Sequence, residues 1–493
     1  MSTTSAPAAL SPSITERDQI YVAGAWRTGG AGSRPVLSPA TGQPVGSVGV
    51  SNTDDVDAAV AAARTALTGW AGLAAAERSA VLHRLADELS ARAADIATLV
   101  TAQNGMPITL SVPAEGHGPV EILRYYADLI LDEDLETRRP AVGRPGSTVV
   151  RHAPIGVVAA IVPWNFPQSL AMFKLAPALA AGCPVVMKPA PETPLDALLL
   201  ADAAHAAGLP AGVLSVIPGD VEIGRHLVAH PGVDKVAFTG STAAGREIGE
   251  VCGRLLRPVT LELGGKSAAI VLDDADMTSM ARGLASASLL NAGQTCYSST
   301  RILVPNSRYQ EAVDAIVSMV GSMPIGDPFD AATRVGPLIS RTQRDRVMAA
   351  IAEATAAGAR VATGGEVPDG LPDGNYLAPT VLTDLDNTFA IARQELFAPV
   401  LCVIGYDTVE EAISIANDSD YGLGGTIWTR DEERALDLAR TIETGAVGIN
   451  FFSLDIGAPF GGVKASGLGR ELGPEGLGVY RVSQSIYLRP PRK

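Results

Sequence analysis

The spacing of hydrophobic and polar residues changes along the chain, and each spacing predicts a different kind of element. Short alternating runs broken by Gly and Pro over residues 19–50 are typical of small β-strands. From Asn52, a candidate helix cap, Ala, Val and Leu recur at helical spacing as far as residue 100. Gly105 and Pro107 end this pattern. We therefore expect strands at the start of the chain and a long helical region after them.

Apolar runs alternate with Ala-rich segments in the rest of the chain. Residues 139–147 are rich in Arg, Pro and Gly and predict a projecting hairpin, while the continuous apolar run at residues 156–162 predicts a buried strand. Such alternation favours βαβ units and a mostly parallel sheet, so we expect an α/β protein. Residues 482–488 are typical of a terminal edge strand. The other strand candidates are residues 184–187, 213–216, 235–238, 267–271, 301–304, 400–404, 424–428 and 445–450.

Length and charge limit the classes of function. With 493 residues, the chain is long enough for several domains of roughly 150 residues each. Its 53 acidic and 38 basic residues give a formal net charge of -15. This balance disfavours nucleic acid or an anionic membrane as a partner, because both attract a basic surface. The longest apolar runs are well short of the ~18 residues that indicate a membrane span.

The use of cysteine indicates the compartment. Cysteines lie at positions 183, 252, 296 and 402, without the spacing of a zinc site or a redox motif. No metal is therefore expected, and free thiols favour a reducing cytoplasm. Residues 1–17 are rich in Ser, Pro and Ala and lack a signal-peptide pattern. We predict that these residues are disordered and that the protein is soluble and cytoplasmic.

One cysteine and one upstream carboxylate are the strongest chemical candidates. Cys296 lies in a polar, turn-prone run that is a poor core segment, although a lone cysteine is more often a small buried hydrophobe. A thiolate can attack a carbonyl carbon, and Glu262 can take a proton from water in a later step. The alternative interpretation is that Glu262 is an ordinary carboxylate at a strand end, without a catalytic role. Asn165, in a stiff segment between two prolines, can donate its amide to an oxyanion, or the segment is only a structural turn.

A second group of residues suits a nucleotide. Residues 236–245 predict a strand, a small-residue turn and a helix start, where Ser241 can lie near a pyrophosphate or act as a plain N-cap. Lys188 ends a predicted strand, the end at which ligands bind in open α/β sheets. Glu395 can bind sugar hydroxyls and Phe397 can pack on a flat heterocycle. Each of these residues also has an ordinary structural role as its alternative.

Aromatic residues indicate a pocket for an apolar substrate. They can line a tunnel, although aromatic residues are more often plain core. The candidates are Trp164, Phe166, Phe173, Phe451, Phe452 and Phe460.

Taken together, these segments resemble the aldehyde dehydrogenase superfamily. They follow the order of that family and extend over nearly the whole chain. The matching residues are 39–42, 163–167, 188, 238–245, 262–266, 293–296, 379–380, 395–399, 450, 459–462 and 466–471.

The resemblance implies a reaction and roles for its residues. An aldehyde, here apolar or aromatic, is oxidised to the acid with NAD(P) through a cysteine thiohemiacetal and a thioester. Cys296 is the implied nucleophile, Glu262 the base for hydrolysis, and Asn165 with the Cys296 amide the oxyanion hole. Lys174 and Glu471 match family positions linked to a proton path. The implied cofactor residues are Trp164, Lys188, Pro191, Gly219, Ser241, Leu263, Glu395 and Phe397.

The resemblance also implies an architecture. Residues 1–131 and 152–261 correspond to a Rossmann-like cofactor domain, and residues 262–478 to an α/β catalytic domain. Residues 132–151 and 479–493 correspond to a small β arm that joins subunits. We therefore expect a homodimer or a homotetramer.

One departure from the family leaves the cofactor open. The usual Lys-x-x-Glu, whose Glu holds the adenosine ribose of NAD, ends here in Pro191. We favour NAD over NADP because no Arg or Lys stands beside Lys188 in the sequence to bind a phosphate. The pocket-forming segments contain no arginine, but Arg124 is a candidate to reach the substrate.

Two alternatives to a hydrolytic dehydrogenase remain. The first is a CoA-acylating aldehyde dehydrogenase, although such relatives commonly lack the Glu at position 262. The second is a non-catalytic member of the fold that acts in binding or structure.

Overall fold

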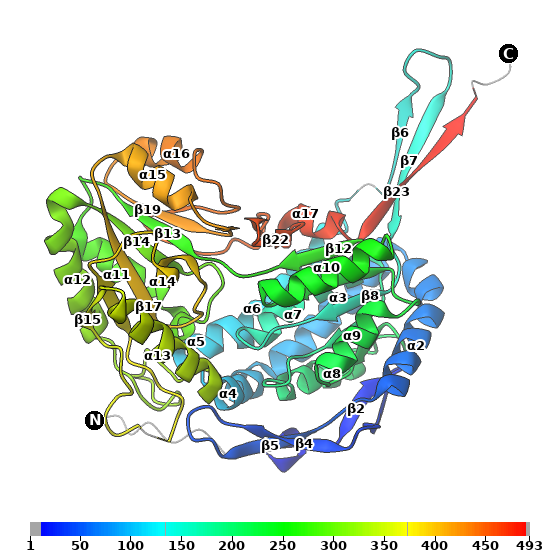
Figure 1. Cartoon of the computed structure of the whole chain (residues 1–493). Coiled ribbons are helices and arrows are strands. Elements are labelled where there is room, and N and C mark those ends of the chain that lie inside the picture. Colours follow the sequence, from blue (N-terminus) through cyan, green and yellow to red (C-terminus); the bar gives the residue numbers. More distant parts are fainter. Residues whose placement is uncertain (1–10, 134, 372, 490–493) are drawn as a thin grey trace.

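The first of two large sheets has parallel strands at its centre. The computed structural model describes residues 11–133, 135–371 and 373–489 (Figure 1). The strands of this sheet are β2 (Gln19–Val22), β3 (Ala25–Thr28), β8 (Val158–Ile161), β9 (Val185–Lys188), β10 (Leu214–Val216), β11 (Lys235–Thr239), β12 (Val259–Glu262) and β22 (Gly467–Leu468). Their order is β22-β12-β11-β8-β9-β10-β2-β3, and β12, β11, β8, β9 and β10 are parallel. The predicted α/β class and parallel sheet are confirmed.

Helices cover both faces of this sheet. They include α2 (Thr53–Ala71), α3 (Ala75–Ala91), α4 (Ala93–Asn104), α6 (Gly118–Leu129), α7 (Pro167–Ala181), α8 (Leu195–Ala206), α9 (Val221–Ala229) and α10 (Thr242–Arg254). Successive side chains of a strand point to opposite faces. Val158 and Ala160 of β8 pack into one core cluster with α3 and α7, whereas Ala159 and Ile161 pack into another with α2 and α9. The strand is therefore apolar on both sides, as its continuous run predicted.

The predicted helical region begins at the expected cap and is divided into three helices. The Asn52 side chain accepts a hydrogen bond from the Asp55 amide at 3.0 Å, and the Asp55 carboxylate accepts one from the Asn52 amide at 3.0 Å. This reciprocal pair satisfies two donors that the first turn of α2 leaves unpaired. Gly105 has a φ of 81°, which ends α4 in the left-handed conformation that glycine adopts without strain.

The second large sheet carries the other half of the chain. Its order is β15-β16-β17-β14-β13-β19-β20, and all its pairs are parallel except β15 with β16. Its strands are β13 (Ser267–Val271), β14 (Ser299–Pro305), β15 (Arg360–Thr363), β16 (Thr380–Thr383), β17 (Val400–Tyr406), β19 (Gly425–Trp428) and β20 (Gly448–Ile449). The helices against it include α11 (Met277–Ser288), α12 (Tyr309–Gly321), α13 (Arg341–Ala356), α15 (Val409–Asn417) and α16 (Glu432–Ala439).

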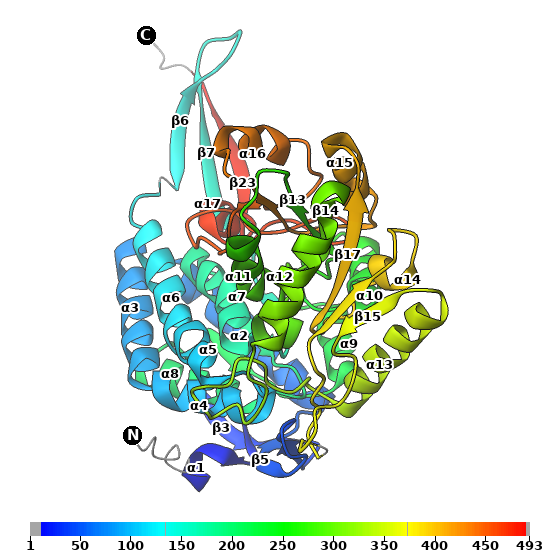
Figure 2. The same ribbon diagram turned by 90° about the vertical axis from the view of Figure 1, so that its left-hand side faces the viewer.

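A three-stranded arm projects from the body of the molecule (Figures 1 and 2). It consists of β6 (Glu136–Pro140), β7 (Ser147–Pro154) and β23 (Arg481–Leu488), all antiparallel. β23 lies at its edge, as predicted, and its Val482 and Ile486 side chains remain exposed. The arm therefore presents apolar surface outside the core.

Other features differ from the sequence-based expectations or complete them. Pro12–Thr15 forms α1 and Glu16–Arg17 forms β1, which pairs with β5 (Pro44–Gly49), so the prediction of disorder is wrong for these residues. Residues 1–10 and 490–493, which the disorder and arm predictions also included, lie outside the described residues. In the described part of the chain, no helix combines the length and the apolar character that a bilayer crossing requires.

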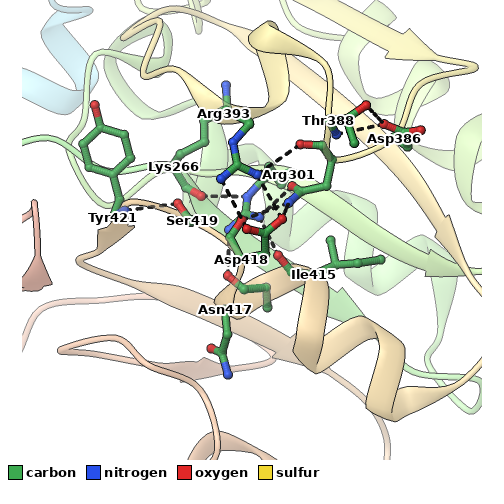
Figure 3. Close-up of polar contacts among 12 residues, drawn as sticks. Lys266, Arg301, Asp386, Thr388, Arg393, Ile415, Asn417, Asp418, Ser419 and Tyr421 are labelled. Carbon is green, nitrogen blue, oxygen red and sulfur yellow. Dashed lines mark hydrogen bonds and ion pairs between the residues drawn. The ribbon is translucent and has the colours of Figure 1, made fainter.

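Arg301 of β14 is a buried polar hub beneath the second sheet (Figure 3). Its guanidinium donates to the carbonyl oxygens of Lys266, Ile415 and Ala416 at 2.9, 2.7 and 2.8 Å. It also donates to Asn387 Oδ1 at 2.9 Å. Burial lowers the Arg301 pKa to about 10. Five planar donors thus fix the loop after β12 against α15, which a single-point cation such as lysine cannot do.

We expect Arg301→Met to destabilise the protein strongly. The substitution leaves three buried carbonyl oxygens without a donor, and each such group costs about 1–3 kcal/mol. The midpoint of urea denaturation should fall well below that of the wild type. Arg440→Met is the control, because Arg440 is exposed and pairs only with Asp437, and such pairs contribute little. Equal midpoints for the two variants would contradict the assignment of Arg301 as a structural hub.

Candidate active site

The segment before Cys296 has an unusual backbone. Asn291, Ala292 and Gly293 have positive φ angles of 49°, 55° and 70° in succession. This conformation costs roughly 1–2 kcal/mol for each residue other than glycine and persists only where surrounding contacts enforce it. The buried Gln294 side chain supplies such contacts, because it donates to the Asn291 carbonyl at 3.1 Å and accepts from the Ile339 amide at 2.9 Å. The turn leaves the Cys296 side chain only partly exposed.

Asn165 is bonded directly to this segment. It lies between β8 and α7 and is nearly fully buried. Its Nδ2 donates to the Gln294 carbonyl at 3.0 Å, and the Asn291 Nδ2 donates back to the Asn165 carbonyl at 3.0 Å. These two bonds bring the predicted oxyanion donor to the segment that ends in Cys296. An amide nitrogen has two hydrogens, so one N–H of Asn165 remains for another acceptor.

Glu262 ends β12 with its carboxyl group buried. Only 3% of the residue is exposed, and neither carboxyl oxygen has a hydrogen-bond partner among the described residues. A Cβ placed on Gly461 would come within 2.6 Å of Glu262 Oε1, so the carboxyl lies directly against that backbone. Burial raises the Glu262 pKa well above its usual value, and the Glu471 charge raises it further. A proton acceptor with a raised pKa suits general base catalysis near neutral pH.

Lys174 and Glu471, the predicted proton-path residues, form a buried ion pair beside Glu262. Their Nζ and Oε1 atoms are 2.8 Å apart, and neither side chain is more than 2% exposed. Lys174 Nζ also donates to the hydroxyl of Thr239 at 2.5 Å. The charge of Lys174 lowers the Glu262 pKa whereas that of Glu471 raises it. The two charges of the ion pair therefore act on the Glu262 carboxyl in opposite directions.

Glu395 and the Cys296 backbone both lie close to the glycine pair at 264 and 265. The Gly265 amide donates to Glu395 Oε1 at 3.0 Å. A Cβ on Gly265 would lie 2.5 Å from the Cys296 carbonyl oxygen, and one on Gly264 would collide with the Glu395 carboxylate. Burial raises the Glu395 pKa to about 7. The absence of side chains at 264 and 265 is therefore required for this close approach.

The environment of the Cys296 sulfur favours the thiol. Burial raises the Cys296 pKa, and the charges of Glu395 and Glu262 raise it further. Both predicted carboxylates therefore act on the sulfur through their charges. A thiolate is the more reactive nucleophile, so attack requires that the Cys296 proton leaves.

The predicted cofactor residues lie along the C-terminal ends of the first sheet. Lys188, at the end of β9, is nearly buried and donates to the Pro189 carbonyl at 3.1 Å, and burial lowers its pKa to about 8. The Ser241 hydroxyl accepts from the Ala244 amide at 3.3 Å and so is the N-cap of α10. Trp164 and Phe397 meet edge to face with ring centroids 5.4 Å apart. A buried cation with spare donors, a helix N-terminus and flat rings fit a dinucleotide.

Two further predicted cofactor residues, Gly219 and Leu263, follow strands of the first sheet. Gly219 precedes α9, and a Cβ there would meet Ile223. Leu263 follows β12 and packs so closely on Gly245 of α10 that a side chain at 245 would collide with it.

We predicted from the sequence that no basic residue lies beside Lys188, and this prediction is wrong in the folded protein. Arg34 of β4 (Ser33–Leu37) donates to the Pro191 carbonyl at 2.7 Å. Its charge lowers the Lys188 pKa, whereas Glu192 and Asp220 raise it. Sequence adjacency could not reveal Arg34, because more than 150 residues separate it from Pro191.

Aromatic residues gather at a cavity of about 490 Å³. Phe451, Phe452 and Phe460 line it, as predicted, together with the acidic Glu432 and Asp455. Phe166 and Phe173 do not line this cavity. Phe173 belongs to an apolar core cluster, and Phe166 packs against that cluster.

Tyr297, which the sequence did not indicate, packs against two of the residues that line the cavity. Its ring stacks on Phe452 with centroids 4.5 Å apart and meets Phe460 edge-on at 6.5 Å. Its position next to Cys296 was the available signal. Arg124, in contrast, does not serve the pocket, since it pairs with Asp87 at 2.9 Å on the exposed side of α6.

Metal-binding side chains are not clustered in the part of the chain that the structure describes. No group of three or more His, Cys, Asp or Glu residues there has the geometry to hold a metal ion. The four cysteines are all free thiols.

Comparison with known proteins gives one consistent result. The model of the aldehyde dehydrogenase family matches residues 26–486. A geranial dehydrogenase from Castellaniella defragrans is 51% identical over 476 residues, covering 96% of this chain and 99% of that protein. The crystal structure of a Mycobacterium tuberculosis aldehyde dehydrogenase complexed with NAD+ superimposes with a TM-score of 0.95 at 44% identity, covering 97% of this chain and 99% of that one. A betaine aldehyde dehydrogenase from Staphylococcus aureus in complex with NAD+ has a TM-score of 0.94 at 34% identity, covering 97% of this chain and 96% of that one.

Proposed function

Since the chain belongs to the aldehyde dehydrogenase family and is an enzyme that oxidises an aldehyde to the acid with NAD(P), we propose that Cys296, Asn165 and Glu262 carry the reaction. The observation that supports this most directly is the pair of hydrogen bonds between Asn165 and the Cys296 segment. The buried carboxyl of Glu262, which has no hydrogen-bond partner among the described residues, supports it further. Nucleophile, oxyanion donor and base are thus available at one place.

The first half of the reaction uses the sulfur and the amide. Cys296 releases its proton to solvent water, and its sulfur bonds to the aldehyde carbon while the C=O π electrons move to the oxygen, which becomes an oxyanion. The free N–H of Asn165 stabilises this oxyanion, while its other N–H stays on Gln294. The nicotinamide, when bound, supplies the hydride acceptor that turns the adduct into a thioester.

The second half uses Glu262 and the ion pair beside it. Glu262 takes a proton from water, the resulting hydroxide attacks the thioester carbon, and the C–S bond breaks to release the acid and the thiolate. Lys174 and Glu471 then take the proton onward from Glu262. Their buried contact and their opposite effects on the Glu262 pKa support this route.

The substrate is a small apolar aldehyde. Phe451, Phe452 and Phe460 line the cavity, and Tyr297 stacks on Phe452. Aromatic surface of this kind favours hydrocarbon chains or rings. The name of the geranial dehydrogenase, a relative at 51% identity, agrees with an apolar aldehyde.

We also propose a domain organisation, an oligomeric assembly and a cellular location for the protein. Residues 1–131 and 152–261 carry the cofactor, residues 262–478 carry the chemistry, and residues 132–151 and 479–493 form an arm that joins subunits into a dimer or tetramer. The exposed apolar residues of the arm, such as Ile486 and Tyr487, support this role. Free thiols throughout favour the cytoplasm.

Glu262→Gln should separate the two halves of the reaction. We expect a burst of reduced cofactor near one per active site, followed by a steady-state rate at least about 10²-fold below the wild type, because a missing general base costs about 10²–10⁴-fold. Stopped-flow absorbance at the reduced-cofactor band measures both phases. Cys296→Ala should show neither phase. A normal steady state in Glu262→Gln would refute the base assignment, and acyl-CoA formed on adding CoA would favour the acylating alternative.

The wild-type hydrolytic rate should also depend on pH in a defined direction. Glu262 acts as a base only when deprotonated, and its raised pKa moves deprotonation to higher pH than for an ordinary Glu. The steady-state rate of the wild type should therefore rise with pH, while the burst in Glu262→Gln should keep only the pH dependence that comes from the Cys296 thiol.

Substrate preference should depend on the ring of Tyr297. Tyr297→Leu removes the partner of Phe452, and we expect kcat/KM for 3-phenylpropenal to fall about tenfold relative to propanal, since an aromatic contact contributes about 0.5–1.5 kcal/mol. Tyr297→Phe keeps the ring and should behave as the wild type. Kinetics with both aldehydes test this, and an equal loss for both would show that Tyr297 does not select substrates.

Acceptance of NADP should depend on Arg34. Pro191 places no carboxylate against a 2'-phosphate, and Arg34 offers a cation beside it. We expect Arg34→Gln to lower kcat/KM for NADP about tenfold or more and to change that for NAD less than about threefold, because a charged hydrogen bond contributes about 1.5–3 kcal/mol. Initial rates with each cofactor decide this. Arg27→Gln, on the preceding strand β3, is the control and should leave the ratio unchanged.

A further inference from the structure

Helix α7 begins without a capping side chain of its own. The residue at its N-cap is Phe166, which makes no capping hydrogen bond, and Pro167 follows at the first helical position. The amides of Gln168 and Ser169 are then the donors that a Ser, Thr, Asp or Asn at the N-cap would satisfy.

Glu115 satisfies these donors from another part of the chain. Its Oε2 accepts from the Gln168 amide at 2.7 Å and from the Ser169 amide at 3.4 Å. Glu115 is fully buried and lies in the π-helix Val112–His117, a rare element that is frequent at functional sites. The Ser169 hydroxyl donates to the Ala114 carbonyl at 2.5 Å, so two bonded contacts fasten α7 to the π-helix.

Burial of the Glu115 carboxyl group at this place costs folding free energy. Burial raises the Glu115 pKa to about 8, with a further contribution from the charge of Asp196, and the two backbone amides lower it. Glu115 Oε1 has no partner among the described residues, so part of the cost of burial is not offset locally. A simple N-cap such as Ser at 166 would satisfy the same amides more cheaply, but it would remove the Phe166 ring.

The α7 N-terminus controls where Asn165 lies. Asn165 immediately precedes the N-cap, and both its carbonyl and its side-chain amide are bonded to the Cys296 segment. The Asn104 side chain donates to the Trp164 carbonyl at 2.7 Å and fixes the other end of the same loop. A shift of the first turn of α7 would therefore move the Asn165 amide relative to the sulfur.

We propose that Glu115 is a positioning residue that holds Asn165 in place by capping α7 from a distance. This inference rests on the proposed role of Asn165 as oxyanion donor. Glu115 does not contact the substrate, and its effect on the rate passes through Asn165. A misplacement of about 1 Å in such a donor can cost about 10²-fold in rate.

A double-mutant cycle on the burst rate tests this proposal. Glu115→Ala should lower the burst rate about 10²-fold, and Asn165→Ala about 10²–10³-fold. The double variant should be within about twofold of Asn165→Ala, because the cap has nothing left to position. Glu115→Gln keeps an acceptor oxygen and should stay within about threefold of the wild type. Full multiplication of the two single losses would overturn the proposal, and an active Asn165→Ala would instead refute the proposed function.

A loss of stability alone must be distinguished from a loss of positioning. Trp70→Phe is the matched control, because it removes a buried hydrogen bond from Trp70 Nε1 to the Leu179 carbonyl at the other end of α7. It should lower the melting temperature as Glu115→Ala does, yet leave the burst rate within about threefold. If Glu115→Ala does not fold, Glu115→Asp, whose carboxyl is withdrawn by one methylene, enters the same cycle. A burst rate that tracks the melting temperature across all these variants would overturn the proposal.

Discussion

The site depends above all on the two hydrogen bonds that Asn165 exchanges with residues 291–294. Asn165 belongs to the first sheet through β8 and α7, whereas Cys296 precedes β14 of the second sheet. Reactive groups that come from both parts of the chain need a fixed connection at the point of reaction. Hydrogen bonds supply direction as well as attraction, so these two bonds set the amide at a defined angle to the sulfur. The strained left-handed turn at 291–293 is the local cost of that connection.

The buried acids of the site, like the strained turn, lower stability where function requires them. Glu262, Glu395 and Glu471 are largely withdrawn from water, and the pKa of Glu262 and that of Glu395 are raised. Replacement by apolar residues would remove this desolvation cost. The acids are instead grouped where a proton has to leave a thiol and a water molecule. Apolar packing supplies the stability of the protein, and burial of this small cluster of acids lowers the free energy of unfolding.

Local spacing accounts for what the sequence could predict. The alternation of strands and helices, the Asn52 cap and the buried strand at β8 all follow from residues within a few positions of one another. Contacts between distant segments were missed. Examples are the pairing of β22 with β12, the stacking of Tyr297 on Phe452 and the approach of Arg34 to Pro191. Such contacts depend on how whole elements pack, and no local pattern contains that information.

The start of α7 explains why local rules fail where function is concentrated. A local rule expects a short polar side chain at the N-cap, but the chain has Phe166 there, between Asn165, the proposed oxyanion donor, and a helix that carries Lys174. The position cannot hold both a ring and a cap. The capping oxygen therefore comes from Glu115, about fifty residues earlier, and the buried carboxyl that results has no local explanation. A helix start that lacks its usual local cap and is capped by a distant residue is thus itself a marker of a functional site. Without a function, the less costly local cap would suffice.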